Sequence, residues 1–184
     1  MALARTFERL ARAASHKLAF HRLDSLRKAR DEAAGPFADA LGAALTDRAT
    51  SDEAAFFARV EALRAREAAS DEDLEFIDYG AGSRREQYTP EQAARGVPST
   101  RAVASCSRAA KPAFWCRLLF HLVRETKPTR CVELGTSLGI SASYTAGALQ
   151  LEGAGTLVTL EGAPAVAERA AVSYTHLTLP TIQL

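Results

Sequence analysis

Apolar side chains recur at the spacing of an amphipathic helix in two parts of the first seventy residues, where the strong helix formers Ala, Leu, Arg and Glu also dominate. Residues 3–29 form one such stretch, rich in Ala and Arg. A second helix is predicted to start at Thr50, because Thr50 and Glu53 have the spacing of a capping box and apolar positions 56–63 then share one face. We therefore expect residues 1–70 to form a helical N-terminal region.

The helical spacing of apolar residues is lost over residues 71–112, where we expect a loop-rich connector. Residues 74–79 alternate like a short strand, and several glycines and prolines follow. Residues 77–83 (IDYGAGS) contain an acid followed by two spaced glycines, a pattern that on its own resembles a nucleotide-binding turn. Residues 84–100 are polar and hold two prolines, so we predict neither a crossover helix nor a second strand there. The turn is interpreted as a surface loop, with a lid over a ligand as the alternative.

The pattern becomes regular again over residues 113–171. It predicts a helix that ends near a proline, a strand, an Ala-rich helix, a β-branched strand and a final helix, at residues 113–127, 131–134, 140–149, 156–160 and 163–171. The short apolar run 131–134 is typical of a buried strand. Strands that alternate with helices in this way pair in parallel through right-handed crossovers. The expected fold class is therefore α/β.

The candidate site lies in residues 131–141 (CVELGTSLGIS) and 156–162 (TLVTLEG). The first strand ends in Glu133, a turn with Gly135 and Gly139 follows, and the next strand ends in Glu161. A glycine lets the backbone turn sharply and approach a ligand. Free N–H groups at the helix start favour a carboxylate or phosphate, and an acid at the end of the second strand can accept ribose hydroxyls.

The spacing of the glycines separates two kinds of nucleoside ligand. A dinucleotide site has the pattern GxGxxG, whereas here Ser137 stands in place of the second glycine and the third is displaced. Glu133 would repel a pyrophosphate but can pair with an ammonium group. S-adenosylmethionine carries an ammonium group and a sulfonium charge and has no phosphate, so the pattern favours it. An NAD-type oxidoreductase on the same sheet stays open as the alternative enzyme.

These residues resemble motif I and the ribose-binding strand of class I S-adenosylmethionine-dependent methyltransferases. The segments FIDYGAGSR and KPAFWCRLLFHLVRETKP resemble the upstream region of bacterial small-molecule methyltransferases of this class, including O-methyltransferase-like ones. The resemblance implies a Rossmann-like, doubly wound sheet, S-adenosyl-L-methionine as cofactor and a small-molecule methyl acceptor, for which a hydroxyl group is one candidate. It implies cofactor contacts at Glu133, Gly135, Thr136, Ser137, Gly139 and Glu161, and it identifies no catalytic residue.

The last thirteen residues differ in composition from the rest of the chain. Residues 172–184 (VSYTHLTLPTIQL) hold no Ala, Arg, Lys, Asp or Glu, and VSYTHLTLPT resembles the conceptual translation of a transposon-end adapter used in sequencing libraries. The alternative is a natural Thr-rich C-terminal strand. By resemblance the family has seven core strands, of which residues 113–171 would supply the first two. We therefore expect an incomplete, inactive methyltransferase fragment followed by a non-native tail.

Composition and charge reduce the number of functional classes that remain open. With 23 basic and 22 acidic residues the net charge is +1, too weak a field to hold a nucleic acid or a membrane by charge alone. No apolar run reaches the length of a membrane span. The three cysteines have no CxxC spacing and no histidine has a partner at ligand spacing, so we expect no metal site and a cytoplasmic location. A non-enzymatic helical binding protein stays open as the hypothesis from another class.

Overall fold

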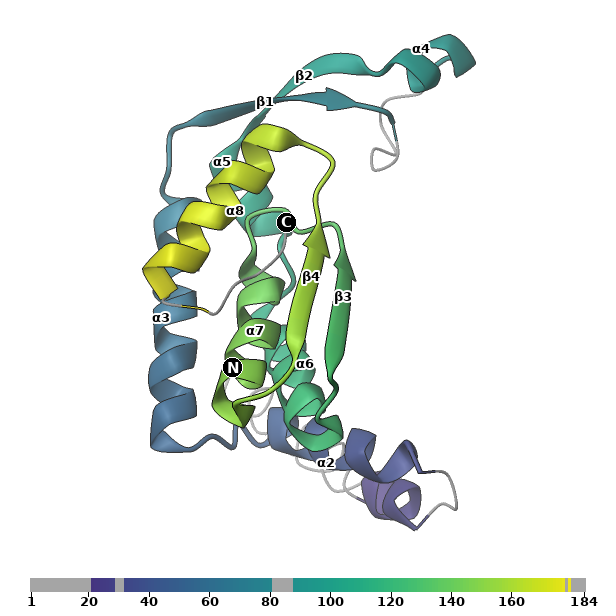
Figure 1. Ribbon diagram of the computed structural model, residues 1–184, viewed down its shortest axis with the longest axis vertical. Coiled ribbons are helices and arrows are strands. Elements are labelled where there is room, and N and C mark those ends of the chain that lie inside the picture. The colour runs from purple at the N-terminus through teal and green to yellow at the C-terminus, as the bar shows by residue number, and fades with distance from the viewer. Residues whose placement is uncertain (1–20, 29–31, 81–87, 178, 180–184) are drawn as a thin grey trace, which may run out of the picture.

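The computed structural model describes residues 21–28, 32–80, 88–177 and 179, which form a mixed α/β structure (Figure 1). A helix at residues 21–27 precedes two longer ones, α2 (Ala34–Leu45) and α3 (Ser51–Ala68). The middle of the chain holds β1 (Asp73–Asp78), α4 (Pro90–Arg95), β2 (Val97–Ala102), α5 (Val103–Ala109) and α6 (Ala113–Thr126). The remaining elements are β3 (Arg130–Leu134), α7 (Ile140–Glu152), β4 (Thr156–Leu160) and α8 (Pro164–Leu177).

The helical character predicted for the N-terminal region is confirmed where the region is described. The capping box at the start of α3 is present: the Thr50 N–H donates to Glu53 Oε2 at 2.9 Å, and the Glu53 N–H donates to Thr50 Oγ1 at 3.3 Å. Residues 21–27 carry the end of the helix predicted over 3–29. The part of that predicted helix before residue 21 lies outside the described residues.

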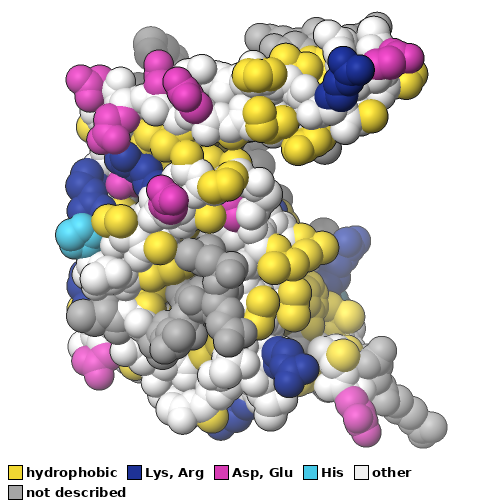
Figure 2. Space-filling view, turned by 45° about the horizontal axis from the view of Figure 1, so that its top comes forward, with side chains coloured by type: hydrophobic (Ala, Val, Ile, Leu, Met, Phe, Trp, Pro, Cys, Tyr) yellow, Lys and Arg dark blue, Asp and Glu magenta, His cyan; other side chains and the backbone are white. Residues whose placement is uncertain are grey.

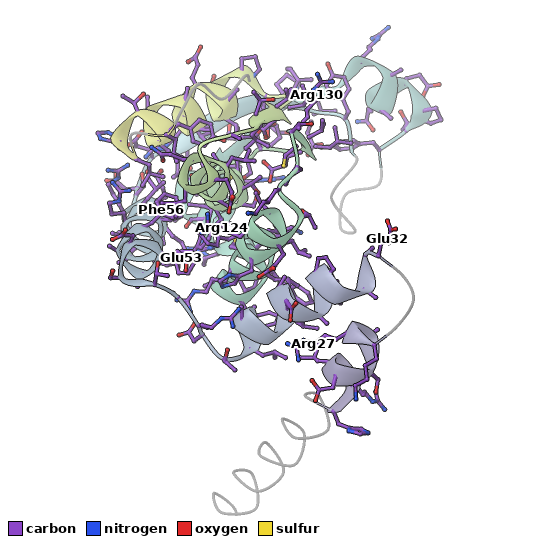
Figure 3. The ribbon with its side chains drawn as sticks, turned by 60° about the horizontal axis from the view of Figure 1, so that its bottom comes forward. Arg27, Glu32, Glu53, Phe56, Arg124 and Arg130 are labelled. Atoms are coloured by element: carbon purple, nitrogen blue, oxygen red, sulfur yellow. The ribbon has the colours of Figure 1, made fainter. Side chains whose placement is uncertain are left out.

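An aromatic cluster forms the core between α3, α6 and α7. The Phe57 ring of α3 lies edge-on to Phe120 of α6, with ring centroids 4.8 Å apart, and 5.3 Å from the ring of Tyr144 of α7. Figure 3 shows Phe56 and Glu53 of α3 turned toward α6, where the Arg124 guanidinium pairs with the Glu53 carboxylate. Burial of large aromatic rings is the main stabilising contribution here.

The connector contains more regular structure than the sequence predicted. β2 pairs antiparallel with β1, and together with α4 the two strands form an arm that projects from the body (Figure 1). The prediction of no second strand in residues 84–100 was therefore wrong, and the short helix α4 between two antiparallel strands was not expected either. Thr89 and Gln92 form a second capping box with proline at the first helical position of α4. Pro98 is tolerated because each strand of a two-stranded sheet is an edge strand, where an N–H donor can be missing.

The antiparallel pairing of β1 with β2 means that the first acid–glycine turn does not lead into a parallel crossover, which a nucleotide-binding turn of this kind would require. Residues 81–87, which include the last three residues of that turn and with them part of the suggested lid, lie outside the described residues.

The predicted parallel pair is confirmed, because β3 pairs parallel with β4 and Glu133 lies opposite Thr159. Side chains alternate between the two faces of a strand. Leu157 and Thr159 point toward the helices and are buried, whereas Val132 and Leu134 are 63% and 80% exposed. Hydrophobic side chains gather on the body below the arm in Figure 2. The expectation of a fully buried strand at 131–134 was therefore wrong, since only one face of this sheet is covered.

The final helix continues beyond the position where the composition changes. α8 runs to Leu177, and Ser173, Tyr174 and Leu177 are buried against the body. Residues 172–177 are therefore helical, which contradicts the alternative of a C-terminal strand over that part of the tail. Burial in this helix does not distinguish a native tail from a foreign one, because any apolar side chain at these helical positions would be drawn into the core.

Candidate functional site

The candidate site is the turn between β3 and α7, which we call the glycine loop (residues 135–139). The loop crosses the end of β4, where the N–H groups of Gly135 and Thr136 both donate to the carbonyl oxygen of Leu160, at 2.8 and 3.2 Å. Gly135 has φ +87°, a value that favours glycine, and a Cβ built on it would meet no atom within 4 Å. The space beside its backbone is therefore open to a ligand.

Gly139 closes the loop and precedes the first turn of α7. Its φ is +76°, its N–H donates to the Thr136 carbonyl at 2.9 Å, and no side chain caps the helix. A Cβ at Gly139 would lie 2.7 Å from the ring of Tyr174 on α8. Glycine is therefore required here by packing as well as by backbone conformation, and the position does not face the open side of the loop.

A chain of polar side chains joins the ends of β3 and β4 to α7. The Glu133 carboxylate accepts from Ser141 Oγ and from Thr159 Oγ1, both at 2.7 Å. Thr159 Oγ1 lies 2.6 Å from Thr136 Oγ1 in the glycine loop. Thr136 and Thr159 are buried, so their hydroxyls need these partners. The network fixes the orientation of the Glu133 side chain through hydroxyl donors, which carry no positive charge.

Glu161 follows β4 directly, and its carboxylate binds the backbone of the glycine loop. Its Oε2 accepts from the Ser137 N–H at 2.8 Å, and its Oε1 accepts from the Ala163 N–H at 3.1 Å. Ser137 has φ +49°, a conformation that is uncommon for a residue with a side chain. Glu161 thus holds the loop in place, and its carboxylate, which has about four acceptor sites, keeps further capacity for hydroxyl donors.

A small cavity of about 270 Å³ lies between the glycine loop and the turn from α5 to α6. Of the six predicted contacts, Glu133, Gly135, Thr136 and Ser137 line this small cavity, whereas Gly139 and Glu161 do not line it and instead form hydrogen bonds within the loop. Lys111 and Ser141 also line it and were missed. Ser141 follows the glycines in sequence and could have been included. Lys111 comes from another segment and had no signal of its own.

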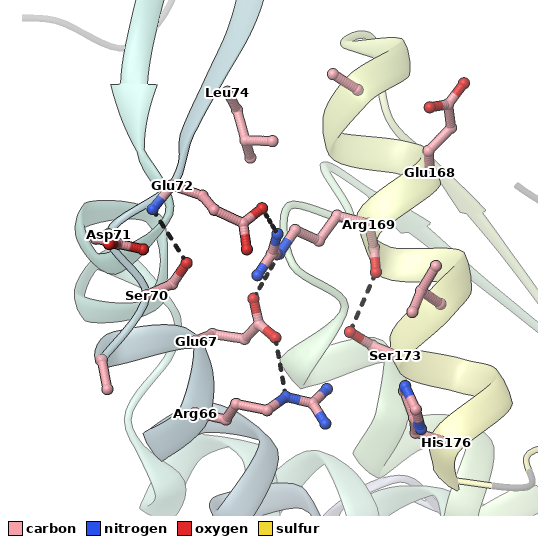
Figure 4. Close-up of a pocket in the computed structure, with 13 residues that line it drawn as sticks. Arg66, Glu67, Ser70, Asp71, Glu72, Leu74, Glu168, Arg169, Ser173 and His176 are labelled. Carbon is pink, nitrogen blue, oxygen red and sulfur yellow. Dashed lines mark hydrogen bonds and ion pairs between the residues drawn. The ribbon is translucent and has the colours of Figure 1, made fainter.

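A larger groove of about 860 Å³ lies between the end of α3, the start of β1 and α8 (Figure 4). Its main charged groups are paired with one another: Arg169 lies 2.6 Å from both Glu67 and Glu72, and Arg66 lies 3.4 Å from Glu67. Glu67 is 2% exposed. These ion pairs join α3, α8 and the segment before β1, so the groove has a structural explanation despite its size.

Titratable groups elsewhere do not suggest a nucleophile. Burial raises the pKa of Cys106, Cys116 and Cys131, which disfavours the reactive thiolate. Burial lowers the pKa of His121, which packs edge-on to Phe120 in the core. Among the described residues, no group of three His, Cys, Asp or Glu side chains could hold a metal ion.

Comparisons with known proteins gave no match, whether with protein-family models, with curated proteins or with solved structures. Within the described part of the chain, the helices are all too short or too polar to cross a membrane.

Proposed function

We propose that this chain binds S-adenosylmethionine and belongs to a methyltransferase that acts on a small molecule. The observation that carries the proposal is the carboxylate of Glu133, which forms no ion pair with another described residue and lines a cavity beside a glycine loop at the carboxyl ends of two parallel strands. Open α/β sheets bind ligands at this edge. The two strands and α7 would then be the first half of a Rossmann-like sheet.

The residues of the loop fit the cofactor. The open space at Gly135 admits a ligand close to the backbone, and Glu133 can receive an ammonium group. Glu161 has acceptor capacity for ribose hydroxyls beyond the two N–H groups that it already binds. When bound, S-adenosylmethionine supplies a methyl group on a sulfonium sulfur, and the task of these residues is to hold it in position for an acceptor.

Glu133 also argues against the NAD-type alternative. Its carboxylate lines the small cavity itself, so a pyrophosphate placed on the loop would lie beside a negative charge. A non-enzymatic binding protein would not require this polar network at a strand end.

Isothermal titration calorimetry with S-adenosylhomocysteine, the demethylated product, tests the proposal on the full chain, with NADH as the competing ligand. We expect binding of S-adenosylhomocysteine, weakened about tenfold or more in Glu161→Ala because charged hydrogen bonds to the ligand and loop are lost. Glu168→Ala, an exposed acid on α8, is the matched control and should bind normally. Binding of NADH alone would support the oxidoreductase alternative, and binding of neither ligand would support a non-enzymatic role.

A further inference from the structure

The parallel sheet has an apolar face that no described element covers. Val132 lies opposite Val158 and Leu134 opposite Leu160, and these side chains share the face that is turned away from α7. Val132 and Leu134, at 63% and 80%, are the most exposed large apolar side chains of the described part of the chain. Apolar side chains that adjoin one another on a surface are typical of an interaction site.

The tip of the arm has a second apolar face. Ile77 is 46% exposed and lies opposite Pro98, which is also exposed. Tyr79 is 57% exposed and lies on the same face, since a Cβ built at Gly96 would meet the side chains of both Ile77 and Tyr79. Leu74, on the opposite face of β1, packs on the core. The arm is therefore attached by one face, and the other face is left uncovered at the tip.

The two apolar faces do not cover each other within one chain. Outside the arm, the main contacts of β1 are with α8 and those of β2 are with α5. Figure 2 shows hydrophobic side chains on the arm and on the body below it, with a hollow between them. Both faces are therefore open to a second molecule.

The two faces match in spacing and are opposite in charge. Each has a charged side chain followed by apolar side chains two and four positions later: Glu75, Ile77 and Tyr79 on the arm, and Arg130, Val132 and Leu134 on β3. Glu75 and Arg130 are exposed, and neither forms an ion pair with another described residue. When two sheets pack face to face with their strands nearly aligned, equal spacing lets all three pairs of side chains meet.

We propose that this chain forms a homodimer in which the arm tip of each copy packs on the uncovered face of β3 and β4 in the other copy. Glu75 of one copy then pairs with Arg130 of the other. A two-fold axis makes the contact twice, so one dimer covers the apolar faces of both chains. The proposal does not depend on the cofactor, because neither face contains a residue of the glycine loop.

Sedimentation velocity of the full chain at about 5 to 500 μM tests the proposal, because dimer formation follows mass action. We expect a shift from monomer to dimer as the concentration rises. Leu134→Ser should raise the dissociation constant roughly 10- to 100-fold, since it removes apolar area from both contacts. Leu151→Ser, at an exposed leucine of α7, is the matched control and should dimerise normally. Circular dichroism checks that both variants fold.

An exchange of charges tests which residues meet. Glu75→Arg and Arg130→Glu should each weaken the dimer roughly 3- to 10-fold, and combining the two substitutions should restore most of the affinity, because the pair forms again with reversed signs. A double variant no tighter than the single variants would overturn the proposed pairing.

The size of the particle gives the remaining outcomes. A monomer at every concentration would overturn the proposal, as it would if the arm folded onto the sheet of its own chain. Open-ended assemblies in place of a dimer would overturn the two-fold arrangement, and equal dimerisation of Leu134→Ser and Leu151→Ser would show that another surface is used.

Discussion

The two small sheets of this protein differ in what surrounds them. β1 and β2 form an arm that projects from the body, and the arm carries exposed apolar side chains such as Ile77 and Tyr79. β3 and β4 are of similar length, but one of their faces packs on α7 and their carboxyl ends hold a network of hydroxyls and carboxylates. Among the described residues, the candidate binding groups lie where helices fix the ends of the strands, which fits the need of binding groups for rigid support.

The two sheets also differ in how their strands pair. Antiparallel sheets can leave one face in water, whereas parallel sheets are normally covered on both faces. The exposed side chains Val132, Leu134 and Leu160 are the uncovered face of the parallel pair. β3 and β4 therefore depend for their stability on α7, which packs on β4, whereas β1 and β2 contact α8 and α5.

The largest expected effect comes from removing an aromatic ring behind the parallel sheet. Phe57→Ala should lower the free energy of unfolding by about 3–5 kcal/mol, because the ring is 4% exposed and touches Phe120 and Tyr144. Phe76→Ala in the arm should cost about 1 kcal/mol, because its ring is only partly buried and stacks under Arg101. Urea denaturation of both variants measures the contrast, and equal losses would contradict it.

The next largest effect concerns the packing of the glycine loop on α8. Gly139→Ala should cost about 2–4 kcal/mol, since the added Cβ meets both an unfavourable φ of +76° and the Tyr174 ring. Gly153→Ala is the matched control, because its φ is +69° but a Cβ there meets open space. Thermal unfolding compares the two, and the excess loss at Gly139 should disappear in a Tyr174→Ala background.

A smaller effect is expected from the hydroxyl network. Thr159→Val should cost about 1–3 kcal/mol, because it leaves Thr136 and Glu133 without a shared partner in a buried position. Thr156→Val, at an exposed position on the same strand, should be neutral. Chemical denaturation gives both values. A neutral Thr159→Val would mean that the network does not hold the strand end.

The smallest effect at neutral pH is expected for Tyr174→Phe. The Tyr174 hydroxyl is buried and has no hydrogen-bond partner among the described residues, so its removal should change stability by less than about 1 kcal/mol or increase it. Burial, and to a lesser extent the nearby Glu133 charge, raises the pKa of Tyr174. The folded state therefore keeps a proton that the unfolded chain loses above the ordinary tyrosine pKa of about 10.

The stability that this proton contributes is complete below about pH 10 and is lost as the pH rises through the higher folded-state pKa. Burial and Glu61 raise the pKa of Tyr144 in the same direction. Denaturation between pH 8 and pH 11 should show a steeper loss of stability for the unmodified chain than for Tyr174→Phe. Parallel curves would contradict the burial of this phenol.

Local patterns predicted much of the body but little of the arm. The capping box at Thr50, the end of α6 before Pro128 and the parallel pair are properties of nearby residues, and the structure confirms them. The arm was missed because Pro98 was interpreted as a loop signal, although an edge strand accommodates it. The uncovered face of the parallel pair could not be predicted either, because burial depends on what else packs there.

The candidate site likewise has features that the local sequence predicts and features that it does not. The positive φ of Gly135 and Gly139 and the position of Glu133 at a strand end follow from the local pattern of acid and glycines. Glu161 was expected to face a ligand, but it also binds the Ser137 N–H, a contact between segments 24 positions apart. Lys111 reaches the cavity only through the packing of α5 and α6, which one stretch of sequence cannot reveal.

Hydrogen–deuterium exchange with and without S-adenosylhomocysteine tests the central claim most directly, because it reports on both sheets in one experiment. We predict slower exchange over residues 135–141 and 161–163 when the ligand is present, and unchanged exchange in β1 and β2. Unchanged exchange over the glycine loop at a saturating ligand concentration, or protection confined to the arm or to the large groove at α8, would contradict the claim that the ends of β3 and β4 form the binding site.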